Sequence, residues 1–248
     1  MKNQNSNLIY GIHSIRSLLQ REPNRILEIF CVESREDVRI QEILSLAQNH
    51  HIAVQKVSKK QLDDWFSECN HQGIAARFRP KPLLDENDLE SLLEDLKTPP
   101  LLLILDGVQD PHNLGACLRT ADAAGVTAVI IPRDRAVGVT ETVRKVSSGA
   151  SESVSIVQVG NLARTLELLK KQGLWIMGTS GEAKQSLYQT DLKGPIAIVL
   201  GAEAKGLRRL TEDHCDVLMH IPMHGIVESL NVSVAAGICL YEAIRQRL

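Results

Sequence analysis

Residues 101–122 read LLLILDGVQDPHNLGACLRTAD, an apolar run that passes through a short polar turn into a helical pattern. The run Leu101–Leu105 has the length and composition of a buried strand. From about residue 113 to residue 124, apolar side chains recur at helical spacing. A strand followed at once by a helix is typical of a β-α-β unit. This stretch therefore predicts an α/β domain built on a parallel sheet.

The same alternation continues to the end of the chain. Five further apolar runs have the length of strands, and helical patterns fall between most of them. Such alternation implies a mostly parallel sheet with helices on both faces. The expected strands are 128–131, 154–159, 174–178, 196–200 and 217–221, and the further expected helices lie near 140–147, 161–172 and 231–247.

A second, smaller α/β pattern occupies the N-terminal third. Its helices are expected from Ile12, over 38–48 and from Ser58, and its strands over 26–32, 52–57 and 73–78. The next stretch is flanked by prolines and contains the acidic segment DENDLESLLEDL, which is typical of an interdomain linker with a short helix. The sequence thus predicts an N-terminal domain over 1–80, a linker over 81–100 and a second domain over 101–248.

Composition excludes several classes of protein. Apolar residues make up 44% of the 248 residues, which excludes a disordered chain. No apolar run approaches the roughly 20 residues of a membrane helix, and the first residues lack the apolar core of a secretory signal. The five cysteines are widely spaced without a C-x-x-C pair, so we expect reduced cytoplasmic thiols and no metal site.

The turn after the first strand of the second domain limits the chemistry. A dinucleotide fold would carry G-x-G-x-x-G there, whereas Gly107 and Gly115 stand eight residues apart. The chain also has no phosphate-cradling P-loop motif and no G-x-S-x-G nucleophile elbow. An oxidoreductase of the Rossmann type is therefore disfavoured.

Glycines and small residues instead cluster after the last three expected strands. The three segments are GTSGEA at 178–183, LGAEAKGL at 200–207 and IPMHGIVESLNVSVAAG at 221–237. Ligands of open α/β sheets bind beyond the carboxyl ends of the strands, and glycine lets the backbone approach them closely. The pattern favours a pocket with much main-chain recognition, although three ordinary turns would have the same spacing.

Several polar side chains in or near the helical patterns have both a structural and a functional interpretation. Arg119 lies among apolar residues, so it requires either an anionic ligand or a structural ion pair. Asn113 stands where the first helix of this domain begins. Ser229 and Asn231 both precede the last helix, and either could be its N-cap or could line a site.

Three segments of the second domain together resemble the SpoU (TrmH) family of the SPOUT superfamily. They are DPHNLGACLRTADAAGV at 110–126, IVLGAEAKGL at 198–207 and IPMHGIVESLNVSVAAGICLYEA at 221–243, in the family's order. The resemblance implies an S-adenosylmethionine-dependent RNA 2′-O-ribose methyltransferase with a trefoil-knotted fold, which is a rare exception to the usual topology rules. It also implies a homodimer in which both subunits shape each active site.

The N-terminal domain fits one branch of that family. LIYGIHSIRSLL at 8–19 and HQGIAARF at 71–78 resemble the small α/β RNA-binding module of the branch that methylates a guanosine in the peptidyl-transferase region of 23S rRNA. Three alternatives remain open. They are the same reaction on transfer RNA, an RNA-binding relative without catalysis, and the oxidoreductase disfavoured above.

The resemblance also assigns residues. It implies that S-adenosylmethionine is bound largely through main chain at Gly201, Ile221 and Leu230, with Thr179 and Gly181 as weaker candidates. The catalytic and substrate positions that it implies are Asn113, Arg119, Glu203, Ser229 and Asn231. The family account often makes Arg119 a base, yet arginine stays protonated at ordinary pH. Arg119 is therefore expected either to act beside a phosphate that relays the proton or to stabilise the developing alkoxide.

The net charge of −2 conceals three different parts. Residues 1–81 carry +3, residues 82–97 carry −5 and residues 98–248 are neutral. A mildly basic N-terminal module is thus masked by the acidic segment, so non-specific RNA binding should be modest. Local basic clusters are Arg77 with Arg79 and Lys81, Arg144 with Lys145, and Arg208 with Arg209.

Overall fold

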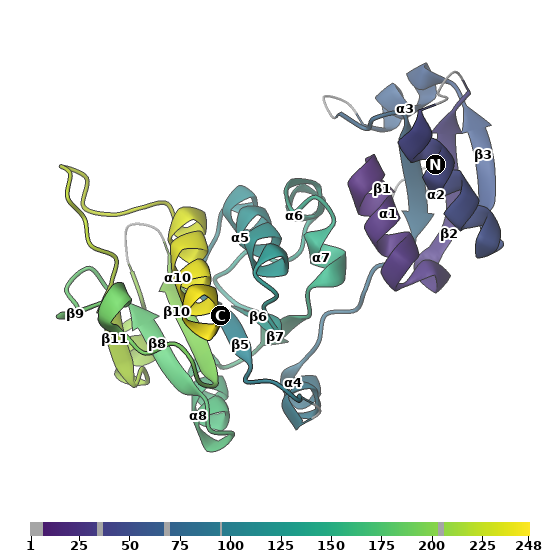
Figure 1. Cartoon of the computed structure of the whole chain (residues 1–248). Helices are drawn as coiled ribbons and strands as arrows, with labels where there is room; N and C mark the ends of the chain where they lie inside the picture. The colour runs from purple at the N-terminus through teal and green to yellow at the C-terminus, as the bar shows by residue number, and fades with distance from the viewer. Residues whose placement is uncertain (1–6, 34–36, 67–69, 95, 203–205) are drawn as a thin grey trace. The chain divides into compact units, whose positions relative to one another are not determined.

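A computed structural model describes residues 7–33, 37–66, 70–94, 96–202 and 206–248. The chain divides into two compact units, Met1–Pro82 and Leu83–Leu248, which are described separately (Figure 1). No helix in the described part of the chain is both long and apolar enough to cross a membrane.

The first unit is a four-stranded sheet covered by helices. Strand order is β1-β4-β2-β3, in which β2 and β3 run parallel and the other neighbours antiparallel. Helices α1 and α2 supply the core on one face, while α3 packs its aromatic end on the other, where Trp65 meets Phe30 edge-on at 4.9 Å. The elements are β1 Leu8–Tyr10, α1 Ile12–Arg21, η1 Pro23–Arg25, β2 Ile26–Val32, α2 Val38–Asn49, β3 Ala53–Val57, α3 Lys59–Trp65 and β4 Ile74–Phe78.

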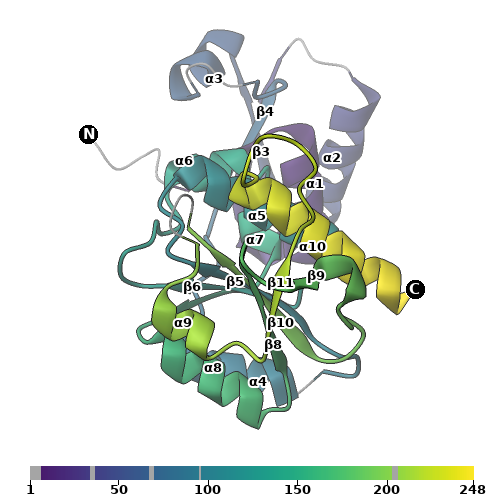
Figure 2. The same ribbon diagram turned by 90° about the vertical axis from the view of Figure 1, so that its left-hand side faces the viewer.

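The second unit is a seven-stranded, fully parallel sheet with the order β7-β6-β5-β10-β8-β11-β9. Figure 2 shows α5, α6, α7 and α10 on one face of this sheet and α4, α8 and α9 on the other. The strands are β5 Leu101–Asp106, β6 Ala128–Pro132, β7 Ile156–Val159, β8 Trp175–Thr179, β9 Gln185–Ser186, β10 Ile196–Gly201 and β11 Val217–His220. The helices are α4 Glu86–Glu94, α5 Pro111–Ala123, α6 Glu141–Val146, α7 Ala150–Ser153, α8 Leu162–Lys171, η2 Leu187–Gln189, α9 Arg209–Asp213 and α10 Val232–Arg247.

The central strands are apolar on both sides because each face is covered. All six residues of β5 are buried, with Leu103 in the core on the α5 and α10 face and Leu102 in the core on the α4 and α8 face. This is the continuous apolar run expected of a parallel sheet covered on both faces. The α/β architecture and the mostly parallel sheet predicted from the sequence are confirmed.

The predicted linker, 81–100, proves to be largely part of the second unit. Leu84 pairs with β7, since its N–H donates to the Ile156 carbonyl at 2.9 Å and its carbonyl accepts from the Gln158 N–H at 2.8 Å. Helix α4 then buries Leu89 completely in the core beneath β7. Asp88 and Glu94 of this helix are exposed, whereas Glu86 is half-buried and accepts the Gly160 N–H at 2.7 Å. The charge pattern therefore reflects an amphipathic helix docked on the second unit rather than a free connection.

Four of the five cysteines fall in the described residues. Cys31, Cys117 and Cys239 are buried in the core, and no disulfide joins cysteines within the described residues. Burial raises the pKa of the Cys239 thiol to about 12, so it stays protonated at neutral pH. These thiols belong to the packing of the fold.

Candidate active site

The candidate site lies at the carboxyl ends of the central strands. Gly201, the last residue of β10, stands beside Asp106, the last residue of β5, and β8 adjoins β10 on its other side. Thr179, which ends β8, donates its hydroxyl to the Val199 carbonyl at 3.2 Å. The Ser180 N–H donates to the Met219 carbonyl at 3.0 Å, which ties the next loop to β11. The glycine-rich loops expected to share one edge therefore do so.

Gly201 occupies a place that no side chain could fill. A Cβ atom on this residue would overlap the backbone of Gly206 and Leu207. The chain turns back on itself here, with the Gly206 N–H donating to the Ala202 carbonyl at 3.0 Å and Gly206 in the left-handed region at φ +64°. Glycine is required for this close approach. Glu203, one of the five expected catalytic residues, lies outside the described residues.

A buried carboxylate fixes the far end of that loop. Asp106 is fully buried, and one of its oxygens accepts the backbone N–H of Arg208 at 3.0 Å. The guanidinium Nε of Arg208 lies 3.4 Å from the other oxygen. The pair joins the exit of β5 to the residue that follows the 200–207 segment. The sequence patterns did not single out Asp106. A charged residue at the end of a continuous apolar strand is the feature that could have indicated it.

Asn113 and Asn231 meet although 118 positions separate them. The Asn231 side-chain oxygen accepts the Ser233 N–H at 2.8 Å, so Asn231 rather than Ser229 caps α10. Its side-chain nitrogen donates to the Asn113 side-chain oxygen at 2.9 Å. Asn113 is buried in the first turn of α5, whose N-cap is Asp110. One asparagine thus caps a helix and joins it to the start of another.

Arg119 is exposed on α5 rather than buried. The buried apolar side of this helix includes Leu114, Cys117, Leu118 and Ala121, whereas Arg119 is exposed. Its Nη1 donates to the Ser148 hydroxyl at a long 3.5 Å, and within the described residues no carboxylate pairs with it. The structural ion pair that the sequence left open is therefore not found in that part of the chain.

The remaining expected residues lie along one irregular segment. Ile221 follows β11 directly and packs against the main core. Ser229 is exposed and Leu230 half-buried, just before Asn231 begins α10. The structure thus places Ile221 at the sheet edge and leaves Ser229 accessible to a ligand.

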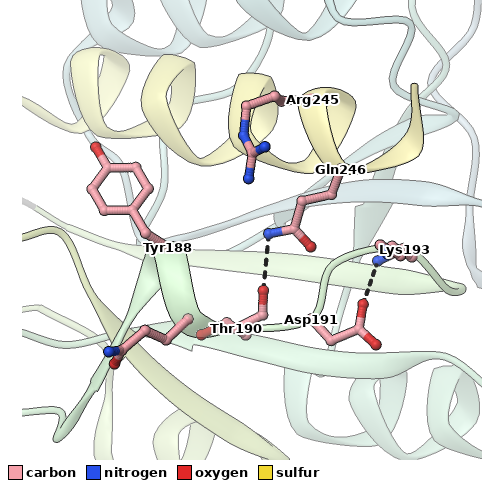
Figure 3. A pocket seen from close by; sticks show the side chains of 7 residues that line it. Tyr188, Thr190, Asp191, Lys193, Arg245 and Gln246 are labelled. Carbon is pink, nitrogen blue, oxygen red and sulfur yellow. Dashed lines mark hydrogen bonds between the residues drawn. The ribbon is translucent and has the colours of Figure 1, made fainter.

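A surface depression of about 440 Å³ lies elsewhere, between the end of α10 and the segment 188–193 (Figure 3). Its polar groups largely satisfy one another, because Gln246 donates to the Thr190 carbonyl at 3.0 Å and Arg245 is bound to Glu242 by two hydrogen bonds of 2.8 Å. Hydrogen bonds from Arg245 and Gln246 lower the pKa of Glu242 to about 2. The depression contains none of the expected site residues.

Across the described ranges, no group of three or more histidine, cysteine or acidic side chains could hold a metal ion.

Removing either asparagine of the Asn113–Asn231 pair should test the dual role of Asn231. We expect Asn113→Ala to lower the free energy of unfolding by about 1 kcal/mol and Asn231→Ala by about 2 kcal/mol, because Asn231 loses a helix cap as well. The double variant should be less destabilised than the sum, since the two residues share one hydrogen bond. Urea unfolding measures all three, and strict additivity would contradict the link. Normal turnover of the Asn231→Ala protein would leave Asn231 with structural roles alone, as the cap of α10 and as the partner of Asn113.

Comparison with known proteins agrees with this geometry. Residues 100–241 match the family model "SpoU rRNA Methylase family", and residues 8–84 match the model "RNA 2'-O ribose methyltransferase substrate binding". A Pseudomonas putida protein named "23S rRNA (guanosine-2'-O-)-methyltransferase RlmB" is 53% identical over 239 residues, which cover 96% of each chain. The protein of the same name from Vibrio vulnificus is 55% identical over 240 residues, which cover 97% of each.

Solved structures agree as well. A crystal structure described as an RNA 2′-O ribose methyltransferase superposes with a TM-score of 0.75 at 30% identity, over 97% of this chain and 88% of that one. The A. aeolicus TrmH/SpoU tRNA modifying enzyme superposes with a TM-score of 0.55 at 31% identity, over 65% of this chain and 83% of its own. The family match spans more than half of the chain and coincides with the unit that holds the candidate site. The chain belongs to the SpoU rRNA methylase family.

Proposed function

We propose that this protein transfers a methyl group from S-adenosylmethionine to the ribose 2′-oxygen of a guanosine in the peptidyl-transferase region of 23S rRNA. Two observations carry the proposal: the hydrogen bond between Asn113 and Asn231, which joins the first and third family segments, and the pairing of β5 with β10, which sets Gly201 of the second segment beside Asp106, four residues before the first segment begins. Relatives more than 50% identical along nearly the whole chain are named for guanosine 2′-O-methylation of 23S rRNA. We expect the enzyme to work in the cytoplasm.

The residues at the sheet edge fit the cofactor. At the Gly201 turn backbone packs directly against the backbone of Gly206 and Leu207, so main-chain groups are what this turn can offer to a ligand. Ile221 and Leu230, in the segment after β11, are proposed to contact the cofactor beside it. Such a site binds through main-chain groups and excludes side chains from the ligand's path. When bound, S-adenosylmethionine supplies a methyl group activated by its sulfonium.

The polar residues orient the RNA. Arg119 is exposed, and a guanidinium stays protonated at ordinary pH, so it acts as a cation on the developing 2′-alkoxide and the adjacent phosphate rather than as a base. Asn113, Ser229, Asn231 and Glu203 are proposed to hold the ribose and close the pocket around it. Alignment of this kind can contribute about 7–11 kcal/mol of barrier lowering.

Two features of the family are proposed for the fold. The first is a trefoil knot, supported by the path of the chain: after β11, near one edge of the sheet, it returns to pack α10 on α5 and β10. The second is a homodimer, supported by apolar side chains that α10 and the segment before it expose, namely Ile226, Val227, Val234 and Tyr241.

The N-terminal unit favours ribosomal RNA over transfer RNA. The tRNA-modifying relative from A. aeolicus matches only 65% of this chain, whereas the relatives named for 23S rRNA match at least 96% of it. The additional unit coincides with the substrate-binding family model over residues 8–84. We therefore assign to this unit the recognition of folded rRNA.

Methyl transfer to defined RNAs tests the proposal. The protein is incubated with tritium-labelled S-adenosylmethionine and either unmodified 23S rRNA or a pool of unmodified tRNA. We expect label on 23S rRNA at one 2′-O-methylguanosine, and its loss from rRNA when the gene is deleted. Labelled tRNA with unlabelled 23S rRNA would overturn the substrate, and RNA binding without any transfer would indicate an inactive relative.

A further inference from the structure

The segment that leaves β6 carries cations that the proposed mechanism does not use. Arg133, Asp134 and Arg135 follow Pro132 directly, and all three are exposed. We name Arg133–Val137 the arginine loop. Neither arginine forms an ion pair with any residue that the structure describes, so their charges face solvent, with Asp134 as the nearest anion in sequence.

Three hydrogen bonds hold this loop in place. The Arg133 N–H donates to the Val159 carbonyl at the end of β7 at 2.8 Å, and the Val137 N–H donates to the Val108 carbonyl at 2.9 Å. Between them, Nη2 of Arg208 donates to the Arg135 carbonyl at 3.3 Å. The loop is thus tied at both ends and at its middle, and its arginines stand on a fixed backbone.

Arg135 adopts a backbone conformation that arginine rarely takes. Its φ of +57° lies in the left-handed region, where glycine and asparagine are favoured. A loop that served only as a connection would accept either residue at this position. Strain that persists in an anchored loop is typical of functional surfaces.

The position of the loop relates it to the methyl-transfer site. Val108, which accepts the bond from Val137, lies two residues before Asp110, the N-cap of the helix that carries Asn113 and Arg119. Arg208, which binds the Arg135 carbonyl, also follows the 200–207 segment and pairs with Asp106. The arginine loop therefore borders the same sheet edge as the Gly201 turn.

We propose that the arginine loop binds backbone phosphates of the substrate RNA next to the target nucleotide, with Arg133 and Arg135 as the contacting residues. The inference rests on the proposed function, because it takes the RNA to enter at Asn113 and Arg119. A guanidinium offers paired donors to phosphate oxygens. Two guanidinium groups on a fixed loop can therefore bind successive phosphates of an RNA strand. Phosphate contacts position the strand without reading its sequence.

The salt dependence of RNA binding tests the proposal. We compare the wild type with Arg133→Gln/Arg135→Asn, which removes both charges and keeps a residue that tolerates the left-handed region at 135. Filter binding of labelled, unmodified 23S rRNA is measured at several KCl concentrations. Two lost phosphate contacts should reduce the slope of log K against log salt by about 1.4–1.8 and weaken binding at low salt about tenfold or more.

Two further variants make the result specific. Arg133→Lys/Arg135→Lys keeps the charges and should keep the slope, because lysine binds phosphate as a point charge. Arg164→Gln/Lys171→Gln removes two exposed charges from α8, on the other face of the sheet, and should leave the slope unchanged. Kd for S-adenosylmethionine should be the same in all four proteins, with the loss seen in KM for RNA.

An unchanged slope in the Arg133→Gln/Arg135→Asn protein overturns the proposal. So does an equal fall in the α8 control, or a lysine variant as impaired as the uncharged one. Failure of the proposed function has a different signature. In that case the slopes of the wild type and of Arg133→Gln/Arg135→Asn still differ as expected, but the wild type transfers no methyl group to 23S rRNA.

Discussion

Replacing Arg119 by alanine is expected to lower the single-turnover rate of methyl transfer by about 10²–10³-fold, the usual effect of removing one donor that stabilises a developing oxyanion. The side chain is exposed, and within the described residues its one hydrogen bond goes to the Ser148 hydroxyl at 3.5 Å, so the fold should tolerate its loss. The free energy of unfolding and Kd for S-adenosylmethionine should remain close to those of the wild type. Rapid-quench measurement with labelled cofactor and saturating 23S rRNA gives the rate.

Two controls define what Arg119 contributes. Arg164→Ala removes another exposed helical arginine, on the opposite face of the sheet, and should leave the rate unchanged. Arg119→Lys retains a charge without the planar fork and should have an intermediate rate if stabilisation of charge is the main effect. Full activity of Arg119→Ala would remove this residue from the mechanism.

Replacing Gly201 by alanine is expected to weaken binding of S-adenosylmethionine about 10- to 100-fold. The added methyl group would overlap the backbone of Gly206 and Leu207, so the turn must open and its main-chain groups must move. Overpacking of this kind costs about 1–3 kcal/mol, which corresponds to that range of affinity when the distortion falls on the binding loop. Isothermal titration calorimetry with the cofactor measures Kd directly.

The matched control is Gly194→Ala, at the other end of β10. A Cβ atom on Gly194 meets open space, so this variant should bind the cofactor as the wild type does. Circular dichroism of both variants separates a local change from unfolding. Unaltered cofactor affinity in a folded Gly201→Ala protein would contradict the placement of the cofactor at this turn.

The alternation of elements was predictable because it follows from local chemistry. The run 101–105 becomes β5 over Leu101–Asp106, and 196–200 becomes β10 over Ile196–Gly201, since short continuous apolar runs suit strands covered on both faces. Helix α10 begins directly after Asn231, whose side chain caps it as Ser, Thr, Asp and Asn do. Family resemblance in the three segments supplied the candidate residues.

Tertiary structure alone decided which of these residues meet. The hydrogen bond between Asn113 and Asn231 spans 118 positions, and the one between Asp106 and the Arg208 backbone spans 102. Such pairs depend on the order of the strands in the sheet, and the local sequence pattern of a strand does not specify that order. Tertiary packing also decided the place of residues 83–94. Proline flanks and acidic residues predicted a linker there, but Leu84 and Leu89 pack against β7 and make this segment part of the second unit. The sequence by itself determined the central strands and the longer helices, but it missed short elements such as β1, β9 and α9 and left both Ser229 and Asn231 as possible caps of α10. Packing of distant segments determined where their polar side chains stand, because only burial and long-range hydrogen bonds select one arrangement of those segments.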